Sequence, residues 1–407
     1  MAAQTNRPVL LVPNQLPLAD ALLSYLNQKR IANSTFTLFG GWGAISTKIE
    51  GVVRTGVTHP RLSLQYVQSG SLNGAFGMLN QVANIPAPAT DYADLIAPSW
   101  YYLSDNADGS VSGGWDESPQ DYSTFVNFVH GRNLKVLPMV SSSWLTTDPA
   151  DTVLSAPAAR AALENNLLQR VNAVNADGIV IDFEYMKDTT GPFLTAFMQE
   201  LSAKFHAQGK LVIEAVMART GKESWLNEFN YRDLAQAVDY LHIMTYDYSS
   251  SVPGPVAPLD WMNQVVQYAK TQGVDLNKVL LGIPYYGKDW YTATPDVPGS
   301  YTLLRNRPLR TLQKYYAGID DLDGAMDRLA LYKAVLQGEA DFNPHYTYTD
   351  EDKNVHQVYF DDAASWNAKL SLMEQYPLAG VGNWSLLWLM NPATGSQIFP
   401  YLKQHLR

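Results

Sequence analysis

Short apolar and β-branched runs alternate with segments of helical periodicity from about Leu62 to the C-terminus. A run of this kind between turn-forming residues is typical of a buried strand. The eight predicted strands cover Leu62–Gln68, Leu95–Tyr102, Leu134–Val140, Gly178–Glu184, Lys210–Met217, Tyr240–Tyr246, Val279–Tyr286 and Ala379–Trp384. Strands that alternate with helices predict an α/β fold with a parallel sheet, and eight of them favour a closed (β/α)8 TIM barrel over an open sheet.

Several segments between these strands carry apolar residues at spacings of three and four, as the buried side of a helix requires. The predicted helices cover Ser118–Val129, Ala158–Val174, Pro192–His206, Tyr231–Val238, Leu259–Thr271 and Ala363–Gln375. Each falls between two predicted strands or next to one, so the pattern is consistent with one barrel over residues 61–407.

Two parts of the chain interrupt this alternation. Residues 290–357, between the seventh and eighth strands, are too many for a barrel loop. They contain a helical pattern at Leu322–Leu336 and a strand-like Tyr346–Thr349, which predicts an inserted α+β subdomain. Residues 1–60 contain an amphipathic helix over Leu18–Leu26 and a glycine-rich turn at residues 40–43. They are interpreted as a small N-terminal extension or domain of unknown role, or as a cap on the barrel.

The charge and composition narrow the range of partners. A net charge of -10 repels phosphate backbones, so nucleic acid is not expected as a partner. No apolar segment is long enough to predict a membrane span. Aromatic residues make up 12% of the chain, and their flat faces suit stacking against sugar rings. The run Val9–Val12 is too short for the core of a signal peptide, and no such peptide is visible.

Metal and cofactor chemistry is not indicated. The chain has no cysteine, and its seven histidines have no spacing typical of metal ligands. Gly109, Gly113 and Gly114 resemble a turn and not a phosphate-binding loop. We therefore predict no metal and no cofactor, while the oligomeric state stays open.

The segment Asp177–Tyr185 carries the clearest chemical signal. On a strand successive side chains alternate, so Val180, Asp182 and Glu184 share one face. The active sites of TIM barrels lie at the carboxyl ends of the strands, where these two acids are expected. Two like charges in one site raise the pKa of at least one of them, which supplies a proton donor near neutral pH. The alternative is that both acids form ordinary ion pairs at a strand end.

Four motifs in order carry a resemblance to a known family. Asp177–Glu184 resembles the D-G-x-D-x-D-x-E signature of glycoside hydrolase family 18, the chitinase-like family. Met244–Tyr248 resembles its M-x-Y-D motif on the sixth strand. Gly282–Gly287 with Trp290, and Gly380–Trp384, resemble its motifs on the seventh and eighth strands.

Within this family the chain is most similar to the bacterial spore-germination and cortex-lytic branch of N-acetylglucosaminidases. Softer motifs carry this likeness: Ile96–Tyr101 followed by Asp108-Gly109-Ser110, then Val136–Ser143, and finally Tyr359–Asp362. That branch acts on peptidoglycan, so the resemblance implies a polysaccharide substrate, either peptidoglycan or chitin, and action outside the cell, at the envelope or on the spore.

The resemblance implies a retaining, substrate-assisted glycosidase that cleaves polymers containing N-acetylglucosamine. Glu184 would be the proton donor, Asp182 would hold the 2-acetamido group of the sugar, and Tyr246 would bond to its oxygen. Residues expected to bind the substrate are Asp247, Trp384, Tyr185, Met244, Trp100 and Tyr285.

Alternatives remain at this stage. A chitinase or chitooligosaccharide hydrolase would use the same residues, and a non-catalytic sugar-binding relative would have the same fold. The family usually has a further acid at the position of Val180, which shares a proton with the residue matching Asp182. Valine cannot do this, so Asp182 is expected to depend on other partners. Arg219, after the fifth strand, could reach a substrate hydroxyl, but we interpret it as half of an ordinary surface ion pair.

Overall fold

The chain divides into two compact units, Met1–Arg61 together with Arg407, and Leu62–Leu406. The structure, a computed structural model, describes residues 20–31, 53, 61–69, 74–75, 77, 92–113, 119–142, 149–249, 252–292, 301–303, 325–350, 353–389 and 392–406. In the first unit it contains the helix α2 (Asp20–Ile31), which overlaps the helix predicted there. The predicted turn at residues 40–43 lies outside the described residues.

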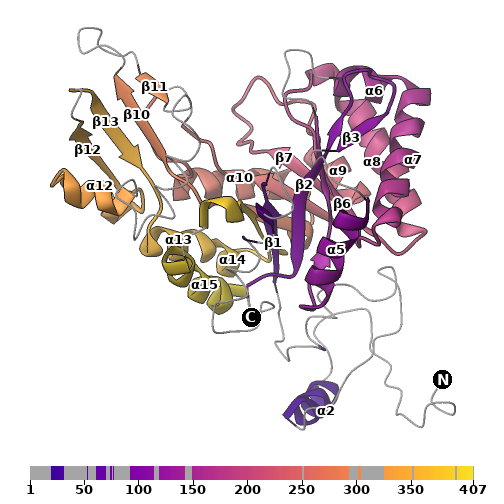
Figure 1. The fold of residues 1–407 in the computed structure, drawn as a ribbon, viewed down its shortest axis with the longest axis horizontal. Helices are drawn as coiled ribbons and strands as arrows, with labels where there is room; N and C mark the ends of the chain where they lie inside the picture. The colour runs from indigo at the N-terminus through magenta and orange to yellow at the C-terminus, as the bar shows by residue number, and fades with distance from the viewer. Residues whose placement is uncertain are drawn as a thin grey trace. The chain divides into compact units, whose positions relative to one another are not determined.

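Eight parallel strand positions close into a barrel in the second unit, which confirms the predicted fold class (Figure 1). β1 pairs in parallel with both β14 and β2, and this closes the ring. The barrel strands are β1 (Leu62–Val67), β2 (Leu95–Leu103), β4 (Lys135–Val136) continued by β5 (Met139–Ser141), β6 (Gly178–Asp182), β7 (Leu211–Met217), β8 (Tyr240–Met244), β9 (Val279–Pro284) and β14 (Gly380–Trp384). The third position is split because Pro138, between β4 and β5, has no N–H to donate to a ladder.

Helices cover the outside of the barrel, and Figure 1 shows α5 in purple and α7 and α8 in magenta beside the strands β2 and β6. The α-helices are α5 (Pro119–His130), α6 (Ala150–Ser155), α7 (Pro157–Ala173), α8 (Gly191–His206), α9 (Tyr231–Ala237), α10 (Leu259–Thr271), α13 (Ala363–Leu370), α14 (Leu372–Gln375) and α15 (Pro392–Leu406). Short 3-10 helices occupy Asp188–Thr190, Leu276–Lys278, Glu339–Asp341 and Leu386–Leu389. A further strand, β3 (Val111–Gly113), forms an antiparallel hairpin with β2.

Contacts on the two faces of the strands show which side chains point into the barrel. The ring of Phe183 stacks on Phe197 of α8 at a centroid distance of 6.0 Å, so Phe183 points outward. Its alternating neighbours Val180 and Asp182 therefore face inward. Tyr66 of β1 and His242 of β8 meet although their strands are not neighbours, which places both side chains inside the barrel.

Aspartates hold the amino-terminal end of the barrel together. Asp94, Asp177 and Asp239 each precede a strand, and one carboxylate oxygen of each accepts a hydrogen bond from a backbone N–H of a neighbouring strand. The donors are Ser63, Val136 and Val212, at 2.9, 2.8 and 2.8 Å. Asp177, the first acid of the sequence signature, is thus at the end of β6 opposite to Asp182.

The predicted insertion between the seventh and eighth barrel strands is a separate antiparallel sheet with one described α-helix and one short 3-10 helix. Its strands pair in the order β11-β10-β13-β12. They are β10 (Lys288–Thr292), β11 (Tyr301–Leu303), β12 (His345–Thr349) and β13 (Val355–Tyr359), with α12 (Ala325–Leu331) between β11 and β12 in the chain. Figure 1 shows this sheet in orange to yellow, with α12 beside it.

Candidate active site

Asp182 and Glu184 lie at the carboxyl end of β6. Asp182 is the last residue of the strand and is in register with Ser141 of β5. The backbone of this end is held by Ser142, whose N–H donates to the carbonyl oxygen of Asp182 at 3.3 Å. The backbone N–H of Glu184 donates a hydrogen bond to the Ser142 hydroxyl at 3.4 Å. Glu184 itself is half-buried. The third and fourth strands therefore fix the position of both acids together.

Asp182 is buried inside the barrel. The residue is 6% exposed, and its Oδ1 has no hydrogen-bond partner among the described residues. Burial raises the pKa of Asp182 to about 7. Val180 is two residues before Asp182 on the same face of β6 and is fully buried. Its aliphatic side chain cannot form a hydrogen bond with the carboxylate. Glu214 on β7 is fully buried too. Burial and then the charge of Asp182 raise its pKa, and the charge of Glu214 in turn raises the pKa of Tyr66 inside the barrel.

The hydroxyl of Tyr246 is within reach of the charges of the carboxylates in the site. Tyr246 follows β8 and is 9% exposed. Burial raises its pKa well above the usual range, and the charges of Asp182, Glu184 and Asp247 add to this, together with Tyr66. Carboxylates influence a neighbour in this way only at short range inside a protein. The predicted catalytic residues Asp182, Glu184 and Tyr246 therefore lie within electrostatic range of one another.

Asp247 forms an ion pair with the inserted sheet. Its Oδ1 lies 2.5 Å from Nζ of Lys288, the first residue of β10. The Lys288 ammonium also donates to the carbonyl oxygen of Ser249 at 2.7 Å. Lys288 is 4% exposed, whereas the Asp247 side chain is 54% exposed and has a backbone φ of +59°. Asp247 thus presents a paired but accessible carboxylate beside Tyr246.

A row of rings lies between Trp384 and Tyr246. Trp384, at the end of β14, is half-buried, and its ring centroid is 5.2 Å from that of Tyr66. The Tyr66 hydroxyl lies 2.8 Å from Nδ1 of His242, whose ring is 6.3 Å from Tyr246. Burial lowers the pKa of His242 to about 3, so the ring is neutral and its Nδ1 can accept a hydrogen bond from the Tyr66 hydroxyl.

Gly382 on β14 makes room for the His242 ring. A Cβ atom at Gly382 would lie 2.3 Å from Cδ2 and 2.4 Å from Nε2 of His242. A steric clash with His242 therefore explains why the eighth-strand motif has glycine at position 382. This glycine lets a buried imidazole occupy the centre of the barrel.

The structure brings some of the other predicted residues to this site and leaves others away from it. Met244 is at the end of β8 and is 8% exposed, and Tyr185 follows Glu184 with 75% of its surface exposed. Trp100 is fully buried, with its ring 4.8 Å from Tyr122 and 5.5 Å from Phe125, both of α5. Tyr285 is fully buried too, and its hydroxyl accepts a hydrogen bond from Gln65. Trp100 and Tyr285 therefore cannot contact a sugar and are removed from the proposed site.

The expectation for Arg219 was wrong. It is 8% exposed, donates to Asn227 Oδ1 at 3.0 Å and to the carbonyl oxygen of Phe229 at 3.4 Å, and lies over the ring of Tyr268. It is a buried residue that holds the loop after β7, and no ion pair of Arg219 is seen in the described part of the chain.

Three residues of the site were missed by reasoning from the sequence: Tyr66, His242 and Lys288. A tyrosine or histidine within an apolar run is hard to distinguish from ordinary core. Lys288 directly follows the seventh-strand motif, and this position was a usable signal. Among the described residues, no cluster of three or more histidines, aspartates or glutamates could hold a metal ion. No described helix combines the length and apolar character needed to cross a membrane.

Comparisons with known proteins agree with this geometry. The family model of the glycosyl hydrolases family 18 matches residues 71–387. The cortical fragment-lytic enzyme of Bacillus subtilis is 28% identical over 229 residues, which are 55% of this chain and 49% of that protein. This relative confirms the resemblance to the spore cortex-lytic branch. The chain spans about half the length of the curated relatives that it matches.

Solved structures give the same result at the level of the fold. A C-terminal domain from Desulfitobacterium hafniense DCB-2 is 37% identical, with a TM-score of 0.75, over 86% of this chain and 100% of that chain. A chitinase from Chromobacterium violaceum ATCC 12472 is 26% identical, with a TM-score of 0.68, over 85% of this chain and 99% of that chain. Since the family match covers most of the chain, the protein belongs to the glycosyl hydrolases of family 18.

Proposed function

We propose that the protein is a retaining glycosidase that cleaves β-1,4 bonds next to N-acetylglucosamine by substrate assistance. Glu184 gives its proton to the glycosidic oxygen as the bond to the anomeric carbon breaks. The carbonyl oxygen of the sugar's own 2-acetamido group attacks that carbon and forms a cyclic oxazolinium ion. Water then opens the ring and gives its proton to Glu184, which returns the acid to its starting state.

The remaining residues stabilise the cyclic ion and hold the sugar. Asp182 accepts the acetamido N–H and balances its positive charge, an interaction that is strong because the carboxylate is buried. Tyr246 donates to the acetamido oxygen, and Asp247 binds a sugar hydroxyl. Trp384 supports the apolar face of the ring, while Tyr185 and Met244 contribute to its surroundings.

One observation carries this proposal. Asp182 and Glu184 stand at the carboxyl end of β6, and their charges reach Tyr246, which follows β8 and directly precedes Asp247 in the chain. Acids and a hydroxyl brought together from two strands suit a reaction in which an amide oxygen is positioned, a proton is delivered and a positive charge develops. Ordinary ion pairs at the strand ends would instead have brought arginine or lysine to Asp182, and its pKa is raised rather than lowered.

Peptidoglycan is the substrate that we propose first, with action at the envelope or on the spore. The support is the similarity to a protein whose name describes lysis of cortical fragments. Chitin or chitin oligomers are the second candidate, supported by the similarity to a chitinase across most of both chains. Both polymers offer the 2-acetamido group that the mechanism requires.

The test is product analysis by mass spectrometry on spore cortex, vegetative peptidoglycan and chitin oligomers. Cleavage on the reducing side of N-acetylglucosamine, with the β-anomer formed first, is expected. Loss of a positioned general acid costs about 10²- to 10⁴-fold in rate, so Glu184→Gln should fall by that amount. Glu339→Gln, in an exposed 3-10 helix of the inserted subdomain, is the matched control and should keep the wild-type rate.

Two results would reject the proposal. Equal rates for Glu184→Gln and the wild type on all substrates would remove Glu184 as the proton donor. Initial formation of the α-anomer would exclude retention. Cleavage of chitin oligomers with no attack on either peptidoglycan would select the second substrate and leave the mechanism intact.

A further inference from the structure

Two adjacent residues of β10 connect the barrel to the inserted sheet. Lys288 pairs with Asp247, as described above. Asp289 is fully buried and its Oδ2 accepts hydrogen bonds from Nη1 of Arg328 and from the hydroxyl of Tyr348, both at 3.0 Å. Successive side chains of a strand point to opposite faces. β10 therefore directs one charge toward the proposed sugar-binding carboxylate and the next into the inserted subdomain.

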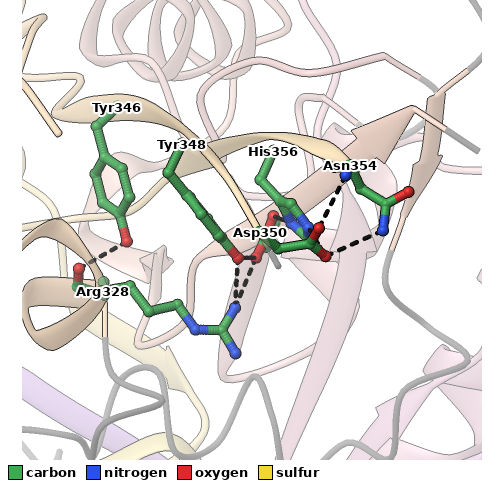
Figure 2. A network of polar contacts seen from close by, with 8 residues as sticks. Arg328, Tyr346, Tyr348, Asp350, Asn354 and His356 are labelled. Atoms are coloured by element: carbon green, nitrogen blue, oxygen red, sulfur yellow. Dashed lines mark hydrogen bonds and ion pairs between the residues drawn. The ribbon is translucent and has the colours of Figure 1, made fainter. Parts of the chain in front are cut away.

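Asp289 is part of a buried network of charges, most of which Figure 2 shows. His356 of β13 has its Nδ1 2.8 Å from Asp289 Oδ1 and its Nε2 3.2 Å from Asp350 Oδ2. Both ring nitrogens face carboxylate oxygens, so His356 links Asp289 to Asp350. Arg328 reaches the other oxygen of Asp289.

The network joins most elements of the inserted subdomain. Arg328 comes from α12, Tyr348 from β12, His356 from β13 and Asp289 from β10. The ring of Tyr348 stacks on that of His356 at 4.4 Å. Removing one partner of a buried ion pair leaves an uncompensated charge, so each member holds the others in place. β10 is thereby fixed at the residue next to Lys288.

We propose that Asp289 and His356 are positioning residues for the glycosidase, and that they act through Lys288 on Asp247. Asp289 and His356 are both fully buried, so neither touches a sugar. Instead, the network holds β10 at the height where the Lys288 ammonium reaches Asp247 and Ser249. This inference rests on the proposed function, in which Asp247 binds the sugar.

A double-mutant cycle tests it. His356→Gln and Lys288→Met are made singly and together, and KM and kcat are measured on soluble N-acetylglucosamine oligomers. Binding of the same oligomers is measured by calorimetry with Glu184→Gln added to each variant. We expect His356→Gln to raise KM and the dissociation constant by about fivefold, and to have no further effect once Lys288 is methionine, because coupled residues are not additive.

His345→Gln is the matched control. His345 is in the same sheet, where its ring stacks on Tyr359 at 4.6 Å and its Nδ1 lies 2.9 Å from the carbonyl oxygen of Asn343, outside the network. It should leave KM unchanged. If His356→Gln does not fold, Tyr348→Phe takes its place in the cycle, because it removes only the hydroxyl that bonds to Asp289 and Arg328.

The outcomes separate the two proposals. Equal effects of His356→Gln with Lys288 present or absent, or no effect on KM and binding, would overturn the positioning role while the enzyme remained active. A wild-type protein that neither binds nor cleaves any oligomer or peptidoglycan would overturn the proposed function, and the positioning role with it.

Discussion

The Tyr66 hydroxyl lies 2.8 Å from Nδ1 of His242, across the interior of the barrel from β1 to β8. Both residues are buried, and their strands are separated in the ring by β14 and β9. The Trp384 ring is 5.2 Å from Tyr66 and the Tyr246 ring is 6.3 Å from His242, and the charges of Asp182 and Glu214 reach Tyr66. A neutral pair thus occupies the region below the proposed catalytic residues.

Gly382→Ala should disturb this pair. The added methyl group would lie 2.3 Å from the His242 ring, so the ring must move and Tyr66 loses its acceptor. Overpacking of this kind costs about 1–3 kcal/mol of folding free energy, and turnover should fall as well. Urea unfolding and turnover measure the two effects. Gly131→Ala, where a Cβ atom has no contact closer than 3.4 Å, should change neither, and an unaffected Gly382→Ala enzyme would contradict the role of the pair.

The pH dependence of kcat/KM should show the raised pKa of Asp182. The anion is the form that balances the oxazolinium charge, so activity should fall as the pH decreases through about 7. Val180→Asn offers a hydrogen bond to that anion, which lowers its pKa and should move the acid limb down by about one pH unit. Val180→Ala removes volume without adding a donor and serves as the control. If the acid limb of the kcat/KM profile has the same midpoint pH in Val180→Asn and Val180→Ala, the limb does not report the ionisation of Asp182.

Asp182→Asn should gain stability relative to the wild type as the pH rises. The folded-state pKa of about 7 exceeds the ordinary 3.8, so ionisation favours the unfolded chain progressively between these values and by a constant amount above them. The cost reaches at most about 4 kcal/mol, at 1.36 kcal/mol per pKa unit. Urea unfolding at pH 5 and pH 8 measures the change. Asp260→Asn, at an exposed position of α10, should show no such trend, and a constant difference for Asp182→Asn would contradict the burial argument.

Trp384→Ala should weaken substrate binding more than it weakens folding. Trp384 is half-buried and packs against Tyr66, so part of its surface stays open to a sugar. We expect KM to rise about tenfold, in line with the value of an aromatic contact, and Trp384→Phe to retain part of the binding. Trp100→Phe is the contrasting variant, since Trp100 packs against α5 and should affect the unfolding midpoint but not KM. The opposite pattern would move the sugar site to Trp100.

The barrel could be predicted from the sequence because its strands are short apolar runs between turns, and the motifs mark where several of them end. The face of β6 was predictable too, since only the inward face carries acids. On β2 both faces are apolar, so the sequence could not tell that Trp100 points toward α5. The C-terminal helix α15 was missed because Pro400 lies inside it and interrupts the helical pattern.

Pairings between distant residues were beyond local patterns. Nothing near His242 in the sequence indicates Tyr66, which is 176 residues away, and nothing near Asp289 indicates His356, which is 67 residues away. The site could be predicted where one strand carries it. Its supporting contacts could not, because they depend on which strands and inserted segments meet in space.

The hydrogen bonds from neighbouring strands to Asp94, Asp177 and Asp239 determine which parts of the enzyme can change in sequence without loss of the fold. Closure of the ring is supported at one end and bond cleavage occurs at the other, so the loops that contact the substrate can be exchanged without loosening the ring. Asp177 and Glu184 share one short strand segment, yet damage to them would be seen in different quantities. Loss of the Asp177 carboxylate would lower the amount of folded enzyme, whereas loss of the Glu184 carboxylate would lower the turnover number of each folded molecule.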